Sequence, residues 1–303
     1  MIVGPTAVGK TAISIQLAQH FGTEIVSADA RQVYQGMPIG TAQPTADERR
    51  VVNHHLVDFL PVVRSYDVKQ FEHDALSALS KIHRRRKIAL ATGGSGLYVK
   101  TLVSGIDDLP EVSEELRSGL QQRWQHEGLS SLLVDLERVD PAYFAIVDRQ
   151  NHRRVLRALE IYHSTGRPYS TFRRQSKDTV RPFHTLMIGL RRARPLLYER
   201  INQRVDRMID YGLVEEAQAL LPYRNYQALR TVGYQELFSF FDGQYDLTEA
   251  QRLIQRNTRR YAKRQLTWFS KDETIRWFDL EAEEDRVTDN IISYVENTLS
   301  HRL

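Results

Sequence analysis

The 303-residue chain contains no cysteine. This absence excludes disulfide bonds, a thiolate nucleophile and zinc sites that use cysteine ligands. No apolar run reaches the roughly 18 residues that a membrane-spanning helix needs, and the opening Met-Ile-Val-Gly-Pro-Thr lacks the basic and apolar regions of a signal peptide. Internal repeats and low-complexity tracts are also missing. Together these absences favour a cytoplasmic protein.

What is present is the composition of an ordinary globular protein. Hydrophobic residues make up 41% of the chain, charged residues 26% and aromatic residues 9%, so extended disorder is not expected. At about 150 residues a domain, the length fits two domains, or one domain that carries a large insertion.

The net charge of +4 is distributed unevenly. The segment 149–194 has 12 Lys and Arg against 2 Asp and Glu, and the segment 252–271 has 7 Lys and Arg and no acid. The residues after Lys271 are acidic, with 9 Asp and Glu against 3 Arg. Two separate basic blocks favour a polyanionic partner. The alternative is that each block is simply a solvated helix face.

Short apolar runs alternate with segments of helical periodicity. We expect strands at 2–3, 24–28 and 87–92, and helices at 11–21 and 67–86. This alternation predicts an α/β fold with a P-loop NTPase-like parallel sheet flanked by helices. Only Met1 to Val3 precede the first loop, so the first strand is either clipped or built from these few residues.

The pattern changes in the middle of the chain. The segment 107–181 is helical in pattern, lacks a convincing strand, and lies between Pro110 and Pro182. We interpret residues 108–182 as an all-helical insertion domain and residues 1–107 and 183–303 as the P-loop core domain. The core then continues with expected strands at 183–190 and 275–279 and helices at 196–211, 214–221, 248–269 and 286–299.

A phosphate-binding motif follows the first strand. The fixed positions of G-x-x-x-x-G-K-[ST] are Gly4, Gly9, Lys10 and Thr11. Such a loop turns backbone N–H groups and a helix N-terminus toward an anion. The lysine adds charge at the phosphates, and the Thr11 hydroxyl suits Mg²⁺. The predicted diphosphate site is Gly4, Pro5, Thr6, Ala7, Val8, Gly9, Lys10 and Thr11.

Asp29 follows the second expected strand. Strand carboxyl ends line the ligand crevice of a doubly wound sheet, so Asp29 should lie beside the phosphates. It could bind a metal from the outer shell, act as a general base, or cap the next turn. The run 88–92 ends instead in Gly-Gly-Ser-Gly, without an acid. Because Leu97 follows Gly96, the G-x-S-x-G pattern of serine hydrolases is broken, and we interpret this turn as a substrate-approach loop.

His54 and His55 are adjacent, so they point to opposite faces of a strand. This spacing is poor for a metal site. We expect them to be structural residues or to lie at the edge of a phosphate site.

Several segments together resemble the bacterial tRNA dimethylallyltransferases (isopentenyl-tRNA transferases). They cover essentially the whole chain, in the order of the family. They are Gly4-Pro-Thr-Ala-Val-Gly-Lys-Thr11, Ser27-Ala-Asp-Ala-Arg-Gln-Val-Tyr34, Met37-Pro-Ile-Gly-Thr-Ala42, His54-His-Leu-Val-Asp58, Gly93-Gly-Ser-Gly-Leu-Tyr98, Arg157-Ala-Leu-Glu160, Val232-Gly-Tyr234 and Ala262-Lys-Arg-Gln-Leu-Thr-Trp268. One departure is Ser95-Gly96, where the family pattern has Thr followed by a larger residue.

The resemblance implies a reaction. A dimethylallyl group moves from dimethylallyl diphosphate to N6 of the adenosine immediately 3′ of the tRNA anticodon, and pyrophosphate leaves without consumption of ATP. It implies that Asp29 is the general base, that Thr6 binds near the reacting centre, and that Arg204 is catalytic at the diphosphate. Arg200 is a further candidate there, although Arg200 and Arg204 could simply coat a helix as an i, i+4 pair. Mg²⁺ is the implied cofactor.

The basic blocks then suit an RNA partner. The insertion should hold the tRNA anticodon stem-loop, and the Arg252, Arg256, Arg259 and Lys263 series should face one way. The predicted tRNA-binding residues are Asp29, Ala30, Arg31, Gln32, Ser95, Arg153, Arg154, Arg157, Arg230, Thr231, Gly233 and Tyr234. An unstacked base could lie on Tyr34, Tyr98 or Tyr234, although at least one of these rings is expected in the core. We expect a monomer.

Two other functions share some of these features. A P-loop small-molecule kinase with a helical lid would use the same loop, Asp29 and Mg²⁺, but would not need the two basic blocks. A non-enzymatic RNA-binding protein with a degenerate P-loop would not need Lys10, Thr11 and Asp29 intact.

Overall fold

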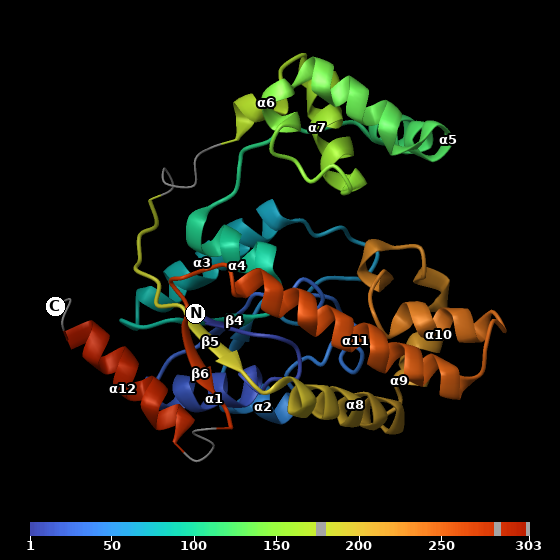
Figure 1. Ribbon diagram of the computed structural model, residues 1–303. Helices are drawn as coiled ribbons and strands as arrows, with labels where there is room; N and C mark the ends of the chain where they lie inside the picture. The colour runs from blue at the N-terminus through green and yellow to red at the C-terminus, as the bar shows by residue number, and fades with distance from the viewer. Residues whose placement is uncertain (174–179, 282–285, 301–303) are drawn as a thin grey trace. The chain divides into compact units, whose positions relative to one another are not determined.

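The computed structural model describes residues 1–173, 180–281 and 286–300 (Figure 1). The chain divides into two compact units, one of Met1–Val103 with Arg181–Leu303 and one of Ser104–Val180. Residues 174–179 of the expected helical insertion, and 282–285 of the acidic segment, lie outside the described residues. In the part of the chain that is described, no helix has both the length and the apolarity required to cross a bilayer.

The first unit is built on a six-stranded parallel sheet. In spatial order its strands are β3 (His54–His55), β2 (Ile25–Ser27), β4 (Leu90–Gly93), β1 (Ile2–Val3), β5 (Ile188–Arg191) and β6 (Arg276–Asp279). The two residues of β1 suffice for a central strand, because Ile2 pairs with Thr92 on one side and with Ile188 on the other. The predicted P-loop NTPase-like α/β fold is therefore confirmed.

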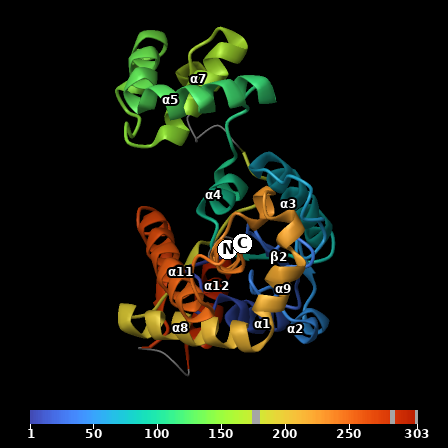
Figure 2. The same ribbon diagram turned by 90° about the vertical axis from the view of Figure 1, so that its right-hand side faces the viewer.

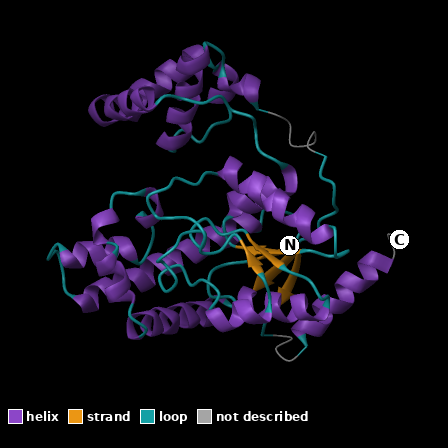
Figure 3. Ribbon diagram, turned by 180° about the vertical axis from the view of Figure 1, so that it is seen from behind, coloured by secondary structure: helices purple, strands orange, loops and turns teal. Residues whose placement is uncertain are grey.

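Helices cover both faces of this sheet (Figure 3). The helices of the first unit are α1 (Lys10–His20), α2 (Ala46–Val51), α3 (Val68–His83), α4 (Gly96–Ser104), α8 (Arg194–Asp210), α9 (Leu213–Ala219), α10 (Tyr234–Phe241), α11 (Leu247–Phe269) and α12 (Val287–Ser300). Successive side chains of a strand point to opposite faces of the sheet, so they pack into different apolar clusters. Ile2 packs in the cluster formed with α1, α8 and α12, and Val3 packs in the cluster formed with α3, α4 and α10.

The expected helices and strands are present, with ends shifted by a few residues. Three helices of the core were not predicted: α2, α10 and α4, which begins directly at the end of the expected substrate-approach loop. The first, α2, carries no apolar periodicity and is identified only by its capping box, in which Thr45 and Glu48 bond each other's backbone N–H groups. The second, α10, begins after Gly233 and is mostly buried. Helix α11 runs beside α8 (Figures 1 and 2).

All regular elements in the described residues of the second unit are helices, joined by loops. It contains α5 (Glu114–Val139), α6 (Pro141–Phe144), α7 (His152–Thr165) and a 3-10 turn at Tyr169–Phe172. Gly128 interrupts α5 with a φ of 78°, a conformation that suits glycine. The two arms of α5 and one face of α7 share an apolar core that includes Leu132, Leu136, Val155 and Leu159.

Candidate active site

The loop between β1 and α1 has the conformation of an anion cradle. Its backbone takes positive φ at Gly4 (150°), Ala7 (63°) and Gly9 (123°). A side chain at Gly4 would overlap the carbonyl of Leu190, so the first glycine of the motif is required by the packing of β5. Gly9 gives α1 no side-chain cap, which leaves the first N–H groups of the helix for a bound anion.

Lys10 folds back across this loop. Its Nζ donates hydrogen bonds to the carbonyls of Gly4 (3.0 Å) and Pro5 (2.8 Å). Burial lowers the pKa of Lys10 to about 8, while the charge of Asp29 raises it and that of Arg204 lowers it further. A poorly hydrated ammonium group at a helix N-terminus gains more from an anion than an exposed one would.

Arginines of the β5–α8 region support the same loop. Arg200 Nε donates to the carbonyl of Ala7 at 3.1 Å, and Arg192 Nε donates to the carbonyl of Val8 at 3.1 Å. Burial lowers the pKa of Arg204, against the opposing charge of Asp29. The structure thus brings Arg204 close to Asp29 and Lys10, and Arg200 does more than coat a helix. Arg192 was not expected at the site, since nothing in its sequence distinguishes it within a basic block.

Asp29 lies two residues beyond β2, at the carboxyl end of the sheet. Its Oδ1 accepts a hydrogen bond from the backbone N–H of Arg31 at 2.9 Å, with the N–H of Gln32 at 3.4 Å. This is the cap on the next turn that we considered as an alternative role. It involves one carboxylate oxygen, so the cap orients the group and remains compatible with chemistry at the other oxygen.

The β4–α4 turn packs tightly against the Asp29 segment. A side chain at Gly93 would overlap the carbonyl of Ala28. The hydroxyl of Ser95 accepts a hydrogen bond from the N–H of Ala30 at 3.0 Å. The predicted substrate-approach loop therefore contacts the carboxylate segment directly, although a threonine was expected at Ser95.

Two residues of α11 contribute to the site and were not predicted. Tyr261 lies near Asp29 and Ser95: burial raises its pKa to about 12, the Asp29 charge adds to that rise, and the bond with Ser95 opposes it. Gln265, one helical turn further on, hydrogen-bonds the N–H of Thr6 and the carbonyl of Gly94. The sequence offered little signal for Gln265: it lies between Ala262 and Phe269 on the buried face of α11, but that face does not show what a polar residue bonds.

The segment before α10 meets the segment after Asp29. The guanidinium of Arg31 donates to the carbonyls of Gln227 (3.0 Å) and Arg230 (3.5 Å). Arg230 is exposed, and Thr231 and Gly233 follow it. The structure thus brings Arg31 and Arg230, two of the predicted tRNA-binding residues, together beyond the carboxyl end of β2.

The three tyrosines considered for base stacking are all in the core. Tyr34, Tyr98 and Tyr234 are buried, and the Tyr98 ring stacks on Phe71 with a centroid separation of 4.2 Å. The hydroxyl of Tyr234 is occupied by a 2.6 Å hydrogen bond to Glu216. Stacking of a base on these rings is therefore a wrong prediction for this structure, and a contact of tRNA with Tyr234 would require its core to open.

Glu216 anchors a further loop of the site. Its carboxylate accepts hydrogen bonds from the N–H groups of Ile39 and Gly40, both at 2.8 Å, as well as from Tyr234. A side chain at Gly40 would overlap the ring of Tyr234. The same loop is held from the other end by Gln32, whose amide donates to the carbonyl of Ala42 at 2.9 Å.

The arginines of α11 differ in what they contact. Arg252 pairs with Glu249 at 2.6 Å, and Arg259 donates to Asn202 of α8 at 2.5 Å. Arg256 contacts Asn257, whereas Lys263 is exposed. The series therefore does not present four equivalent cations.

In the helical unit, Arg153 and Arg154 on α7 are exposed. Arg157 is half-buried and pairs with Glu160 at 3.1 Å. Two of the three predicted phosphate contacts of this helix are therefore accessible, and the third is already engaged.

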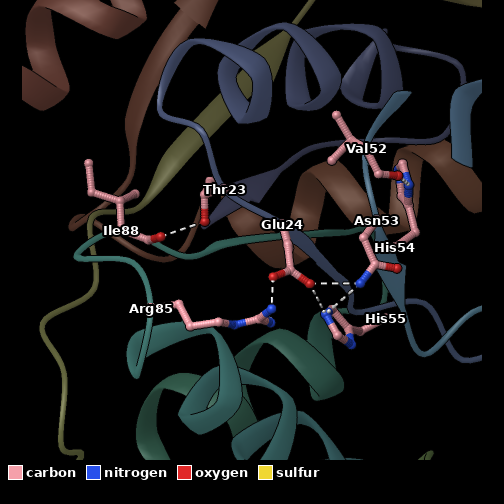
Figure 4. A network of polar contacts seen from close by, with 8 residues as sticks. All are labelled: Thr23, Glu24, Val52, Asn53, His54, His55, Arg85 and Ile88. Carbon is pink, nitrogen blue, oxygen red and sulfur yellow. Dashed lines mark hydrogen bonds and ion pairs between the residues drawn. The ribbon is translucent and has the colours of Figure 1, made fainter. Parts of the chain in front are cut away.

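His54 and His55 belong to a polar network at the opposite end of β2 from Asp29 (Figure 4). His55 Nε2 lies 2.8 Å from the Glu24 carboxylate, which also accepts bonds from Asn53 (2.7 Å) and Arg85 (2.8 Å). Burial opposes ionisation of Glu24, but these partners outweigh it and lower its pKa. The role of the histidine pair is thus structural.

Known proteins resemble this chain closely. The profile of the family described as IPP transferase matches residues 32–272. A tRNA dimethylallyltransferase of Christiangramia forsetii is 46% identical over 299 residues, covering 99% of this chain and 97% of that protein. The tRNA dimethylallyltransferase 1 of Bacteroides thetaiotaomicron is 46% identical over 283 residues, with 93% and 92% covered.

Two solved structures share the fold. The full-length tRNA isopentenylpyrophosphate transferase of Bacillus halodurans has a TM-score of 0.73 at 38% identity, covering 99% of this chain and 96% of that one. A eukaryotic dimethylallyltransferase acting on tRNA has a TM-score of 0.82 at 26% identity, covering 99% and 79%.

Proposed function

The chain belongs to the IPP transferase family, and from this premise we propose that it is a tRNA dimethylallyltransferase. It transfers the dimethylallyl group of dimethylallyl diphosphate to N6 of the adenosine immediately 3′ of the anticodon, and it releases pyrophosphate. The observation that supports this most strongly is that Asp29 interacts electrostatically with both Lys10 and Arg204 beside the P-loop. The carboxylate can accept the proton that N6 loses, and the two cations can stabilise the departing diphosphate.

The P-loop residues 4–11 bind the diphosphate of the donor. The N-terminal N–H groups of α1 and the charges of Lys10 and Arg204 stabilise the negative charge that grows on the leaving group. Thr11, in the first turn of α1, would hold Mg²⁺ together with oxygens of the diphosphate. Mg²⁺ commonly takes few protein ligands beside substrate phosphates, and when bound it neutralises charge on them.

Asp29 is the general base. The exocyclic amine of adenine is a weak nucleophile, and removal of its proton typically contributes ~10²–10⁴-fold. The N6 nitrogen attacks C1 of the donor, the C1–O bond to the diphosphate breaks, and the N6 proton passes to the Asp29 carboxylate. The bond from the Arg31 N–H keeps that carboxylate oriented. Thr6 lies in the cradle next to the reacting centre.

The helical unit, Ser104–Val180, binds the anticodon stem-loop, the role expected for the insertion at 108–182. Arg153 and Arg154 contact phosphates, with Arg157 a further contact once it leaves Glu160. The target adenosine leaves its stack to reach the site, at a cost of a few kcal/mol. Ser95, the segment 29–32 and the residues Arg230, Thr231 and Gly233 contact the RNA near that base, while Tyr234 supports the fold beneath them. We propose further that the protein acts as a monomer in the cytosol.

The experiment that tests this function uses labelled donor. The purified chain is incubated with labelled dimethylallyl diphosphate, Mg²⁺ and an anticodon stem-loop that carries adenosine at the target position. We expect label in the RNA, and no label when that adenosine is replaced by guanosine. Transfer of label from γ-labelled ATP to a small metabolite, with none from the isoprenoid donor, would establish the kinase alternative instead.

A further inference from the structure

The side chain of Gln265 joins two loops of the site that are far apart in the sequence. Its Oε1 accepts a hydrogen bond from the backbone N–H of Thr6 at 2.8 Å, and its Nε2 donates to the carbonyl of Gly94 at 2.9 Å. The residue is 6% exposed. The partners fix the orientation of the amide, because an N–H requires the oxygen and a carbonyl requires the nitrogen.

The fit around this amide is close. A side chain at Gly94 would overlap the Gln265 amide nitrogen, so the turn can approach α11 only at a glycine. Glutamine and the shorter asparagine carry a neutral acceptor and a neutral donor on one planar group at any ordinary pH, whereas a carboxyl carries both only when it is protonated and an imidazole carries them on separate ring nitrogens. A buried bridge between an N–H and a carbonyl therefore favours an amide at this position.

The connection continues from Gly94 to Asp29. Gly94 is followed by Ser95, whose hydroxyl bonds the N–H of Ala30, and Ala30 follows Asp29. Hydrogen bonds and single peptide links thus connect Thr6 in the P-loop with Asp29 through Gln265. In the proposed reaction the P-loop binds the leaving group and Asp29 accepts the proton. The path therefore joins the two parts of the site between which the reaction takes place.

We propose that Gln265 is a positioning residue, which sets the separation between the diphosphate cradle and the Asp29 carboxylate. The inference rests on the proposed function, since that function gives the two ends of the bridge their roles. In this role Gln265 acts through its two hydrogen bonds, to the Thr6 N–H and the Gly94 carbonyl, and not through a contact with substrate. It holds the loops at the spacing that places N6 between the base and C1, and errors of about 1 Å in such spacing can reduce a rate by about 10²-fold.

Replacement by alanine tests the consequence for the rate. We expect Gln265→Ala to lower the single-turnover rate of transfer by about 10- to 10²-fold, with the affinities for donor and stem-loop nearly unchanged. The matched control is Gln255→Ala, because Gln255 also lies on α11 and bonds a neighbouring element, Asp206 of α8, at 2.7 Å. A Gln265→Ala enzyme with the wild-type rate would overturn the proposal.

Replacement by glutamate tests the bridge itself. A protonated carboxyl can accept from Thr6 N–H and donate to Gly94 O, whereas a carboxylate cannot donate. Burial raises the pKa of such a carboxyl, so the bridging form grows as pH falls. We expect the single-turnover rate of Gln265→Glu, divided by the wild-type rate at the same pH, to rise toward acid. The titrations of Lys10 and Tyr261 are common to both proteins and largely cancel in this ratio. A ratio that does not change with pH would overturn the proposal.

A measurement without substrate separates this inference from the proposed function. Amide hydrogen exchange of a peptide that covers Thr6 reports the bond to Gln265 directly. We expect faster exchange in Gln265→Ala and wild-type exchange in Gln255→Ala. If the wild-type chain transfers no isoprenoid, the proposed function fails whatever the exchange shows. If transfer occurs and the Thr6 amide is equally protected in Gln265→Ala, the bridge is not what holds the loop.

Discussion

The hydroxyl of Ser95 accepts a 3.0 Å hydrogen bond from the backbone N–H of Ala30, the residue that follows Asp29. A second bond, from the N–H of Arg31 to Asp29 Oδ1, fixes the carboxylate from the other side. The backbone next to Asp29 and its side chain are thus both held by hydrogen bonds of the fold itself. A group ordered in advance avoids the entropic cost of its alignment when substrates bind.

The first prediction concerns this carboxylate. We expect Asp29→Ala and Asp29→Asn each to lower single-turnover transfer by ~10²-fold or more, because neither side chain can accept the N6 proton. The asparagine oxygen can still accept from the Arg31 N–H, so Asp29→Asn should also keep the turn and the wild-type melting temperature. Stem-loop affinity, measured by filter binding, should stay nearly intact in both. Losses of equal size in affinity and rate would exclude the role of general base.

The second prediction concerns the charge at the P-loop. Burial lowers the pKa of Lys10 to about 8. Pyrophosphate binds best to the protonated lysine, so its affinity should be full below about pH 8 and should fall as pH rises through that value. Titration calorimetry over this range checks the slope. In Lys10→Met the affinity should be lower throughout and this pH dependence lost; a slope that persists in the variant would assign it to another group.

The sequence was sufficient for the parts of the site that lie on local motifs. The P-loop follows from its fixed spacing, and the position of Asp29 follows from the end of a buried strand. Gln265 and Glu216 could not be predicted, because their partners lie 259 and 177 residues away along the chain. Such bonds depend on how α11 and α9 pack, and periodicity gives no information on which polar group a helix aims into the fold.

Burial explains why the tyrosine prediction failed. An aromatic residue suits an RNA-binding surface and an apolar core equally well, so Tyr34, Tyr98 and Tyr234 were ambiguous in the sequence. In the structure the hydroxyl of Tyr234 has its partner, Glu216, inside the fold. The motif Val232-Gly-Tyr234 thus contributes to the site by supporting a loop.

The third prediction tests that support. Tyr234→Phe removes a hydrogen bond to a carboxylate from a buried position and should lower the free energy of unfolding by about 2 kcal/mol. Gly40 bonds the same carboxylate, so the loop at 37–42 should also become easier to open, as measured by amide exchange. Tyr211→Phe is the control, since Tyr211 is 73% exposed. If urea unfolding gave the same free energy of unfolding for both variants, the hydrogen bond from Tyr234 to Glu216 would not stabilise the fold as predicted.

The fourth prediction separates accessible arginines from paired ones. Arg153 and Arg154 are exposed on α7, whereas the guanidinium of Arg224 makes two hydrogen bonds to Asp242, at 2.8 and 2.5 Å. Each phosphate contact that is lost should weaken stem-loop binding and reduce the slope of log K against log salt by about 1. The double variant Arg153→Ala/Arg154→Ala should therefore flatten the slope measured by filter binding. Arg224→Ala removes a charge of the same kind and should leave the slope unchanged. Equal slopes for the wild type and the double variant would remove α7 from the RNA interface, and an equal effect of Arg224→Ala would show that the slope reports net charge and not contact.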